Sequence, residues 1–131
     1  MRVVLDANIF ISAFFWGGNP RLVLERAIIK TDELFVSKEI LEEIEEVLRR
    51  PKFHTGMHEI EYFLKSIEEI SVKIVTRNKI KNGSRDKSDN IYIECAEAAN
   101  ADYIISGDMH LLELKNYKKI RIITPREYLS C

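Results

Sequence analysis

The chain has 131 residues, of which 46% are hydrophobic and 31% are charged, and its formal net charge is −1. This length and composition fit one globular domain with a hydrophobic core, and they exclude a disordered chain. A nearly neutral chain has no bulk attraction to nucleic acid, so any binding to nucleic acid would depend on local patches. We therefore expect a single domain that spans residues 1–131.

Two features bear on the cellular compartment. The apolar stretch over residues 3–16 contains Asp6, is too short to span a bilayer and is followed by no cleavage motif. We interpret this stretch as core, including Phe14, Phe15 and Trp16, for which an exposed contact surface is the alternative. Cys95 and Cys131 form no disulfide framework and lack metal-ligand spacing. The sequence predicts a cytoplasmic protein with no membrane association.

The first half of the chain alternates short apolar runs with helical patterns. Residues 3–5 form a β-branched run typical of a strand buried on both faces, and the run ends directly at Asp6. Residues 34–36 predict a second strand, followed by Ser37 as a helix N-cap. We expect helices over residues 9–14, 21–30, 37–50 and 57–70. On these residues alone, Asp6 fits a helix N-cap as well as a site.

The helix expected over residues 37–50 carries five glutamates, which differ in angular position. At about 100° per residue, its apolar side chains share an arc of about 120°; they are Ile40, Leu41, Ile44, Val47 and Leu48. Glu39, Glu42 and Glu46 lie opposite this arc, where solvation is expected. Glu43 and Glu45 lie about 40° outside its two edges, where a side chain can reach over the sheet. Only these two are candidates for a site.

The second half of the chain places two further acids at comparable positions. Asp89 lies in the first turn of a helix expected to run through residue 99, where the helix dipole favours a carboxylate. Asp108 follows an apolar run over residues 101–105, so it repeats the position of Asp6 after the first strand. The remaining expected elements are strands over 72–75 and 120–123, a loop over 76–87, and short helices at 111–112 and 125–129.

Five short strands separated by helices predict a parallel α/β sandwich. Ligands in such folds bind beyond the carboxyl ends of the strands, where Asp6 and Asp108 are expected. Asp89 opens the helix that leads into the strand of Asp108, and Glu43 lies on a helix between the two strands. Carboxylates gathered in one cleft repel one another unless a cation neutralises them. Oxygen ligands without His or Cys favour Mg²⁺ or Mn²⁺, so this pattern indicates phosphate-ester chemistry.

Four segments together resemble the PIN-domain family, in order and over essentially the whole chain; they cover residues 3–8, 37–43, 86–90 and 101–108. More narrowly, they are similar to its compact branch of VapC-like ribonuclease toxins. The resemblance implies a three-layer α/β/α sandwich with a five-stranded parallel sheet in the order 3-2-1-4-5. In that order the strands that carry Asp6 and Asp108 are neighbours.

The resemblance also implies a metal-dependent endoribonuclease that cleaves single-stranded RNA, the toxin of a type II toxin–antitoxin pair. It implies one or two Mg²⁺ or Mn²⁺ ions, a homodimer and a small antitoxin. The implied catalytic and metal-binding acids are Asp6, Glu43, Asp89 and Asp108. The implied supporting groups are Asn8, Ser106 and Asp86. Two departures from the family pattern are Ser106, where Thr is frequent, and His110, where a further Asp is common and its absence puts the second metal in doubt.

Basic residues flank these acids in two places and are expected to contact the RNA backbone; they are Arg77, Lys79, Lys81, Arg85 and Lys87 in the loop, and Arg49, Arg50 and Lys52 after the third helix. Two alternatives remain. A catalytically inactive PIN-fold module could bind RNA or protein, although the complete set of four acids argues for catalysis. An aspartyl-phosphate phosphatase also begins with a strand and an Asp, but it usually needs a second Asp where this chain has Asn8.

Overall fold

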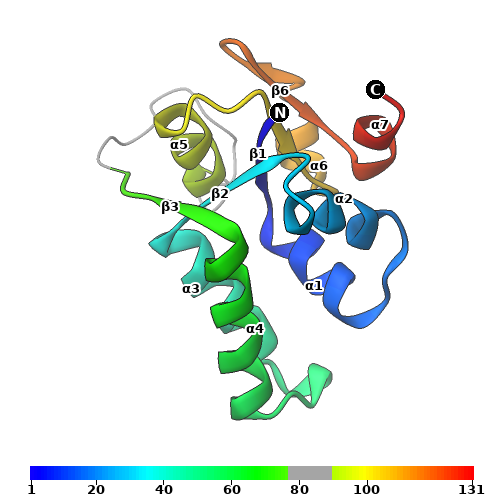
Figure 1. The fold of residues 1–131 in the computed structure, drawn as a ribbon, viewed down its shortest axis with the longest axis vertical. Helices are drawn as coiled ribbons and strands as arrows, with labels where there is room; N and C mark the ends of the chain where they lie inside the picture. The colour runs from blue at the N-terminus through cyan, green and yellow to red at the C-terminus, as the bar shows by residue number, and fades with distance from the viewer. Residues whose placement is uncertain (77–89) are drawn as a thin grey trace.

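A mostly parallel β-sheet forms the centre of the computed structural model, which describes residues 1–76 and 90–131 (Figure 1). Within these residues the sheet has six strands in the order β3-β2-β1-β4-β6-β5. The strands are β1 (Arg2–Leu5), β2 (Glu33–Ser37), β3 (Ser71–Ile74), β4 (Tyr103–Ile105), β5 (Asn116–Tyr117) and β6 (Ile120–Ile123). All neighbours pair in parallel except β5, which pairs antiparallel with β6.

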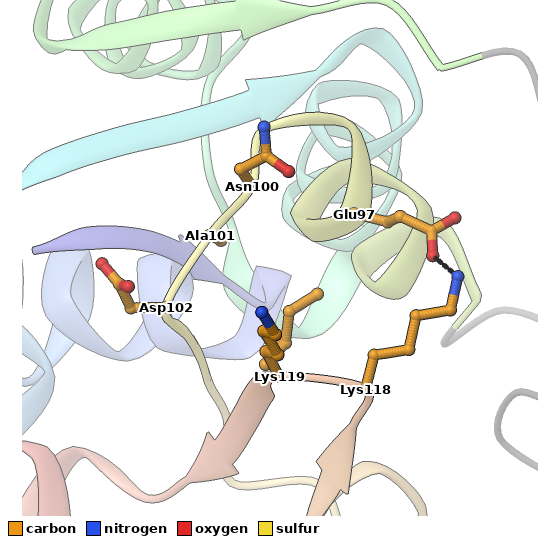
Figure 2. A pocket seen from close by; sticks show the side chains of 7 residues that line it. Glu97, Asn100, Ala101, Asp102, Lys118 and Lys119 are labelled. Carbon is orange, nitrogen blue, oxygen red and sulfur yellow. Dashed lines mark hydrogen bonds and ion pairs between the residues drawn. The ribbon is translucent and has the colours of Figure 1, made fainter.

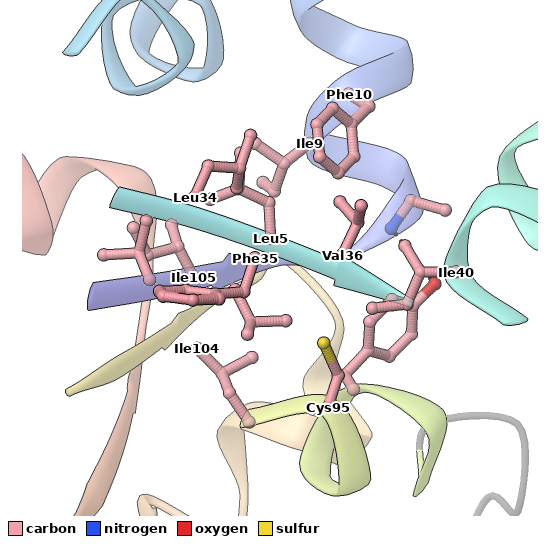
Figure 3. Packing of buried hydrophobic residues seen from close by; sticks show 14 of the residues in the cluster. Leu5, Ile9, Phe10, Leu34, Phe35, Val36, Ile40, Cys95, Ile104 and Ile105 are labelled. Atoms are coloured by element: carbon pink, nitrogen blue, oxygen red, sulfur yellow. Dashed lines mark hydrogen bonds between the residues drawn. The ribbon is translucent and has the colours of Figure 1, made fainter. Parts of the chain in front are cut away.

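Helices cover both faces of the sheet, with α1 and α5 on opposite sides (Figures 1 and 3). The helices are α1 (Ala7–Phe15), α2 (Gly18–Ile28), α3 (Lys38–Leu48), α4 (Met57–Ile70), α5 (Asn90–Ala98), α6 (Met109–Leu112) and α7 (Pro125–Leu129), with a 3₁₀ turn at Pro51–Phe53. Helix α5 packs against β1, β2 and β4, whereas α1 packs against α2 and α3. No helix in residues 1–76 or 90–131 is long and apolar enough to cross a membrane.

The predicted three-layer α/β/α sandwich is confirmed, as is the adjacency of the first and fourth strands. The predicted order of the five parallel strands is also confirmed, and the structure adds one antiparallel edge strand, β5, so that the fifth parallel strand is β6. The sequence pattern did not predict β5, because this strand has only two residues and its turn, at Lys118 and Lys119, contains no Gly, Asn or Pro. Lys118 itself adopts the left-handed conformation of this turn, with φ 55°.

The core lies where the inner strands meet the helices on both faces (Figure 3). The apolar residues of β1, β2 and β4 are all buried, which explains why their sequences are continuous apolar runs rather than alternating ones. Phe14 and Phe15 pack against this core. The expectation that Trp16 is buried was wrong, because its side chain is 71% exposed. Helix α1 ends at Phe15, so Trp16 lies beyond its last turn.

Two isoleucines test how far this core determines stability. Ile44 of α3 is fully buried, whereas Ile29 after α2 is 70% exposed. We expect Ile44→Ala to lower the free energy of unfolding by about 2–5 kcal/mol, because it leaves a cavity in a packed core. The same change at Ile29 should alter it by no more than about 0.5 kcal/mol. Urea denaturation measures both values, and equal decreases in the two variants would contradict the packing described.

Candidate active site

Asp6 lies at the junction of β1 and α1. Its backbone is extended, and one carboxylate oxygen, Oδ1, accepts a hydrogen bond of 3.0 Å from the backbone N–H of Ile9. Asp6 is therefore the N-cap of α1, which was one of the two interpretations that the sequence allowed. The side chain is also only 3% exposed, which is unusual for an N-cap carboxylate, since charged side chains are rarely buried unless they are paired. Capping alone does not explain its burial.

Ser106 connects Asp6 to the neighbouring strand. This fully buried side chain follows β4, and its Oγ donates a hydrogen bond to Asp6 Oδ2. The same Oγ accepts a hydrogen bond of 2.9 Å from the backbone N–H of Asp108. One hydroxyl thus binds both predicted acids at the carboxyl ends of adjacent strands, which are held in register by the pairing of Leu5 with Ile105.

Asp108 is the N-cap of α6. Its Oδ1 accepts hydrogen bonds from the backbone N–H groups of His110, at 2.7 Å, and Leu111, at 3.4 Å. Its second oxygen, Oδ2, has no hydrogen bond to any residue that the structure describes. Asp108 is half-buried, so a ligand can approach it from solvent. Asp6 and Asp108 are therefore both fixed by helix caps, and they lie side by side.

Burial raises the pKa of Asp6 from 3.8 to about 6, because the charged form is poorly solvated. The hydrogen bonds from Ser106 and from the backbone of Ile9 oppose this effect, and the negative charge of Asp108 adds to it. None of these influences comes from a cation among the described residues. A cation bound between the two carboxylates would relieve both the poor solvation and the repulsion.

Tyr92 is a residue of this site that the sequence did not reveal. Its ring is buried on α5, and its hydroxyl oxygen accepts a hydrogen bond of 3.1 Å from the backbone N–H of Ala7. This bond fixes the peptide that follows Asp6 to the helix that begins one residue after Asp89. In the sequence, Tyr92 was one apolar residue on a helix, and nothing in the pattern indicated a polar contact.

The glutamates of α3 follow the predicted burial pattern. Glu39, Glu42 and Glu46 are exposed, and Glu43 and Glu45 are half-buried. The structure distinguishes Glu45 from Glu43, because Glu45 Oε2 forms an ion pair of 2.8 Å with Arg49. No ion pair with a described residue is present at Glu43. None of the described contacts joins Glu43 to Asp6 or Asp108, so its role in the site stays a prediction.

Three of the remaining predicted site residues lie in the described part of the chain, and the others do not. Asn8 is exposed on the first turn of α1, and Lys52 lies over the ring of Phe53 at 5.1 Å. Arg50 is exposed after α3. The other predicted site residues lie outside the described part of the chain; they are Arg77, Lys79, Lys81, Arg85, Asp86, Lys87 and Asp89. Residues 1–76 and 90–131 contain no group of three His, Cys, Asp or Glu side chains close enough to hold a metal ion.

The raised pKa of Asp6 gives a prediction for stability. A carboxyl group whose pKa rises from 3.8 to about 6 on folding stabilises the protein fully below pH 4, and this contribution is lost as the pH increases through 6. Asp6→Asn keeps a neutral side chain at every pH. In a buffer at pH 7.5 that contains a chelator, so that no metal is bound, we expect this variant to be more stable than wild type by about 1–3 kcal/mol.

Urea denaturation between pH 4 and pH 8 measures this difference, which should shrink towards pH 4. Glu42→Gln, which changes an exposed carboxylate on α3, is the control and should shift stability by no more than about 0.5 kcal/mol. If Asp6→Asn were the less stable protein at pH 7.5, burial would not be the dominant influence on this carboxyl group.

Known proteins share this arrangement of elements. The family model described as "PIN domain" matches residues 2–110. The chain is also similar to the crystal structure of VapBC2 from Rickettsia felis bound to a DNA fragment from their promoter, with a TM-score of 0.63 and 17% identity, over 93% of this chain and 97% of that chain. At this identity the likeness shows a common fold. No curated protein sequence matches the chain. Because the family model spans most of the chain, from β1 to α6, the chain belongs to the PIN-domain family.

Proposed function

We propose that this protein is a metal-dependent endoribonuclease that cleaves single-stranded RNA, and that it is the toxin of a type II toxin–antitoxin pair. The observation that supports the proposal most directly is the contact of Asp6 and Asp108 with one hydroxyl, that of Ser106. The resemblance of the surrounding segments to PIN nuclease motifs supports a catalytic role for these acids. A phosphatase that uses an aspartyl phosphate is disfavoured because Asn8 cannot act as the second acid.

The side chains at this site suit Mg²⁺ or Mn²⁺. Asp6 and Asp108 offer carboxylate oxygens, the donors that these ions prefer. A bound cation would stabilise the charged form of Asp6, and none of the described residues supplies one. Asp6 and Asp108 would hold one or two ions, together with Asp89 and Glu43.

The bound metal would lower the pKa of a water molecule and neutralise charge on the phosphate. The residues of this chain then have three tasks. Ser106 and the Ile9 N–H hold the Asp6 carboxylate in a fixed orientation. The cap of α6 holds Asp108 with one oxygen, Oδ2, available to a ligand. Glu43 would orient the attacking water or accept its proton from the edge of α3. Such positioning supplies much of the acceleration in phosphodiester cleavage.

Cleavage of single-stranded RNA in Mg²⁺ tests this proposal. We expect Asp6→Asn and Asp108→Asn to lower the cleavage rate by at least about 100-fold, because each removes a charged metal ligand. Glu43→Gln should lower the rate, whereas Glu42→Gln, on the exposed face of the same helix, should not. Equal cleavage by wild type and Asp6→Asn would contradict the site.

Thermal unfolding in millimolar Mg²⁺ or Mn²⁺ separates the nuclease from an inactive binding module. A protein whose native state binds the ion gains stability as the ion concentration rises above the dissociation constant. We expect this gain in wild type and no such gain in Asp6→Asn. A wild-type protein without any gain and without cleavage would support the binding module.

We also propose where an antitoxin binds. A groove of about 330 Å³ lies between α1, α2 and α4, and it is lined by Ala13, Phe14, Arg21, Leu24, Glu25, Ile28 and Phe63. Exposed apolar side chains on the same helices and just beyond α1 include Trp16, Leu22 and Tyr62. A groove lined mostly by apolar side chains is typical of a protein contact. The groove suits an apolar segment of a small antitoxin, and the homodimer expected from the family resemblance stays a separate prediction.

Adjacent isoleucines provide a matched test of this groove. Ile28 lines it and is 51% exposed, whereas Ile29 does not line it and is 70% exposed. We expect Ile28→Asp to weaken binding of the proposed antitoxin at least about tenfold, because a charge would be buried on binding. Ile29→Asp should bind as wild type does. Isothermal titration calorimetry measures both affinities, and equal affinities for the two variants would contradict binding in this groove.

A further inference from the structure

We infer that the β5–β6 hairpin, residues 115–121, is a contact surface for the backbone of single-stranded RNA that extends from the acidic site. The inference rests on the proposed function, since it assigns a path to the substrate of that same site. The sequence had placed RNA contacts in the loop over residues 77–87 and around Arg49, and the hairpin was in neither set.

The hairpin concentrates positive charge in a chain that is otherwise acidic. Its seven residues contain four of the chain's 20 Lys and Arg residues and none of its 21 acidic residues. All four basic side chains are exposed. Since the whole chain has a net charge of −1, attraction to a polyanion must come from a local patch of this kind.

The position of the hairpin connects it to Asp108. Helix α6 begins at Asp108, and the backbone N–H of Lys115 donates a hydrogen bond of 3.1 Å to the carbonyl of Leu112 in the last turn of this helix. Lys115 follows α6 by three residues, since this helix ends at Leu112. From there β5 runs antiparallel to β6, so the turn at Lys118 and Lys119 lies at the amino end of β6, the opposite end of the sheet from Asp108. An RNA strand that leaves the site along the β5 edge of the sheet would meet these cations in turn.

The four cations differ in how free they are to bind phosphate. Lys118 Nζ forms an ion pair with Glu97 of α5 at 2.5 Å, which raises its pKa. Arg121 lies over the ring of Tyr103 at 6.0 Å and near the carboxylate of Glu127. No ion pair with a described residue occupies Lys115 or Lys119. These two lysines are therefore the principal phosphate contacts.

The surroundings of Lys119 support this assignment. Lys119 lines a cavity of about 360 Å³ between the hairpin and the segment that precedes β4 (Figure 2). The two carboxylates of this cavity are engaged, because Glu97 pairs with Lys118 and Asp102 accepts a hydrogen bond of 2.9 Å from the backbone N–H of Arg2. Lys119 therefore keeps its charge available to an external anion.

The side chains of the hairpin also indicate the class of partner. A polyanionic backbone is the partner that a row of lysines without base-reading side chains suits best.

A pair of matched charge reversals tests the surface. Lys115→Glu/Lys119→Glu changes the two free hairpin cations, and Lys65→Glu/Lys73→Glu makes the same change in net charge on α4 and β3, where both lysines are exposed. The probe is a fluorescein-labelled single-stranded RNA of mixed sequence, and fluorescence anisotropy in EDTA measures its affinity without cleavage. A single-stranded DNA of the same sequence is measured in parallel, and thermal unfolding checks that both variants are folded.

We expect the hairpin variant to bind this RNA at least about tenfold more weakly than wild type, while the control binds within about twofold. The dependence of log affinity on log salt should become shallower by about 0.7 for each phosphate that the variant no longer binds. Equal weakening in both variants would show a bulk charge effect and would overturn the inference, as would stronger binding of DNA than of RNA through the hairpin. So would a hairpin variant that no longer binds the antitoxin but still binds RNA as wild type does.

The cleavage assay separates this inference from the proposed function. If wild type cleaves RNA in Mg²⁺ and the hairpin variant keeps full RNA affinity, the nuclease stands and the hairpin surface is overturned. If neither wild type nor the two variants cleave RNA, but the hairpin variant alone binds RNA more weakly than wild type, the surface stands as an RNA contact and the nuclease is overturned.

Discussion

The arrangement of this molecule's candidate site depends on one hydroxyl group, that of Ser106. It donates to the carboxylate of Asp6 and accepts from the backbone of Asp108, so it connects the ends of β1 and β4. Parallel pairing brings the two strand ends to the same edge, but pairing alone does not orient side chains. The hydroxyl orients the Asp6 carboxylate and holds the backbone of Asp108, whose side chain is oriented by the cap of α6. Threonine, frequent here in the family, would offer the same two hydrogen bonds.

This constraint has an energetic consequence for the fold. A carboxylate buried beside a second carboxylate destabilises the native state at neutral pH, which is the same effect that raises the pKa of Asp6. The core that surrounds the strands must offset it, and residues such as Phe10, Leu5 and Ile104 are buried almost completely. Local instability of this kind is common at functional sites. An exposed cap residue would stabilise α1 at lower cost, which supports the metal-binding role proposed for Asp6.

The sequence predicted those features that repeat along the chain. Short apolar runs predicted the parallel strands, and the Asp that follows two of them predicted two acids at one edge of the sheet. The family resemblance, through its strand order, predicted that the strands of Asp6 and Asp108 are neighbours. Helical angles predicted which glutamates of α3 are exposed. The contact of Tyr92 with Ala7 could not be predicted, because it joins residues 85 positions apart through a single hydroxyl. Asp86 and Asp89 lie outside the described residues, so their predicted roles stay predictions.

The missed strand β5 shows why local charge was harder to interpret than local apolarity. Apolar residues indicate an element by their period, whereas lysines in a two-residue strand and its turn have no period to detect. Only the fold reveals that the hairpin with Lys115 and Lys119 follows α6 and forms the β5 edge of the sheet. The molecule therefore separates its charges, with acids at the carboxyl ends of the strands and exposed lysines along the β5 edge. A polyanion held by the second group would be delivered to a metal held by the first.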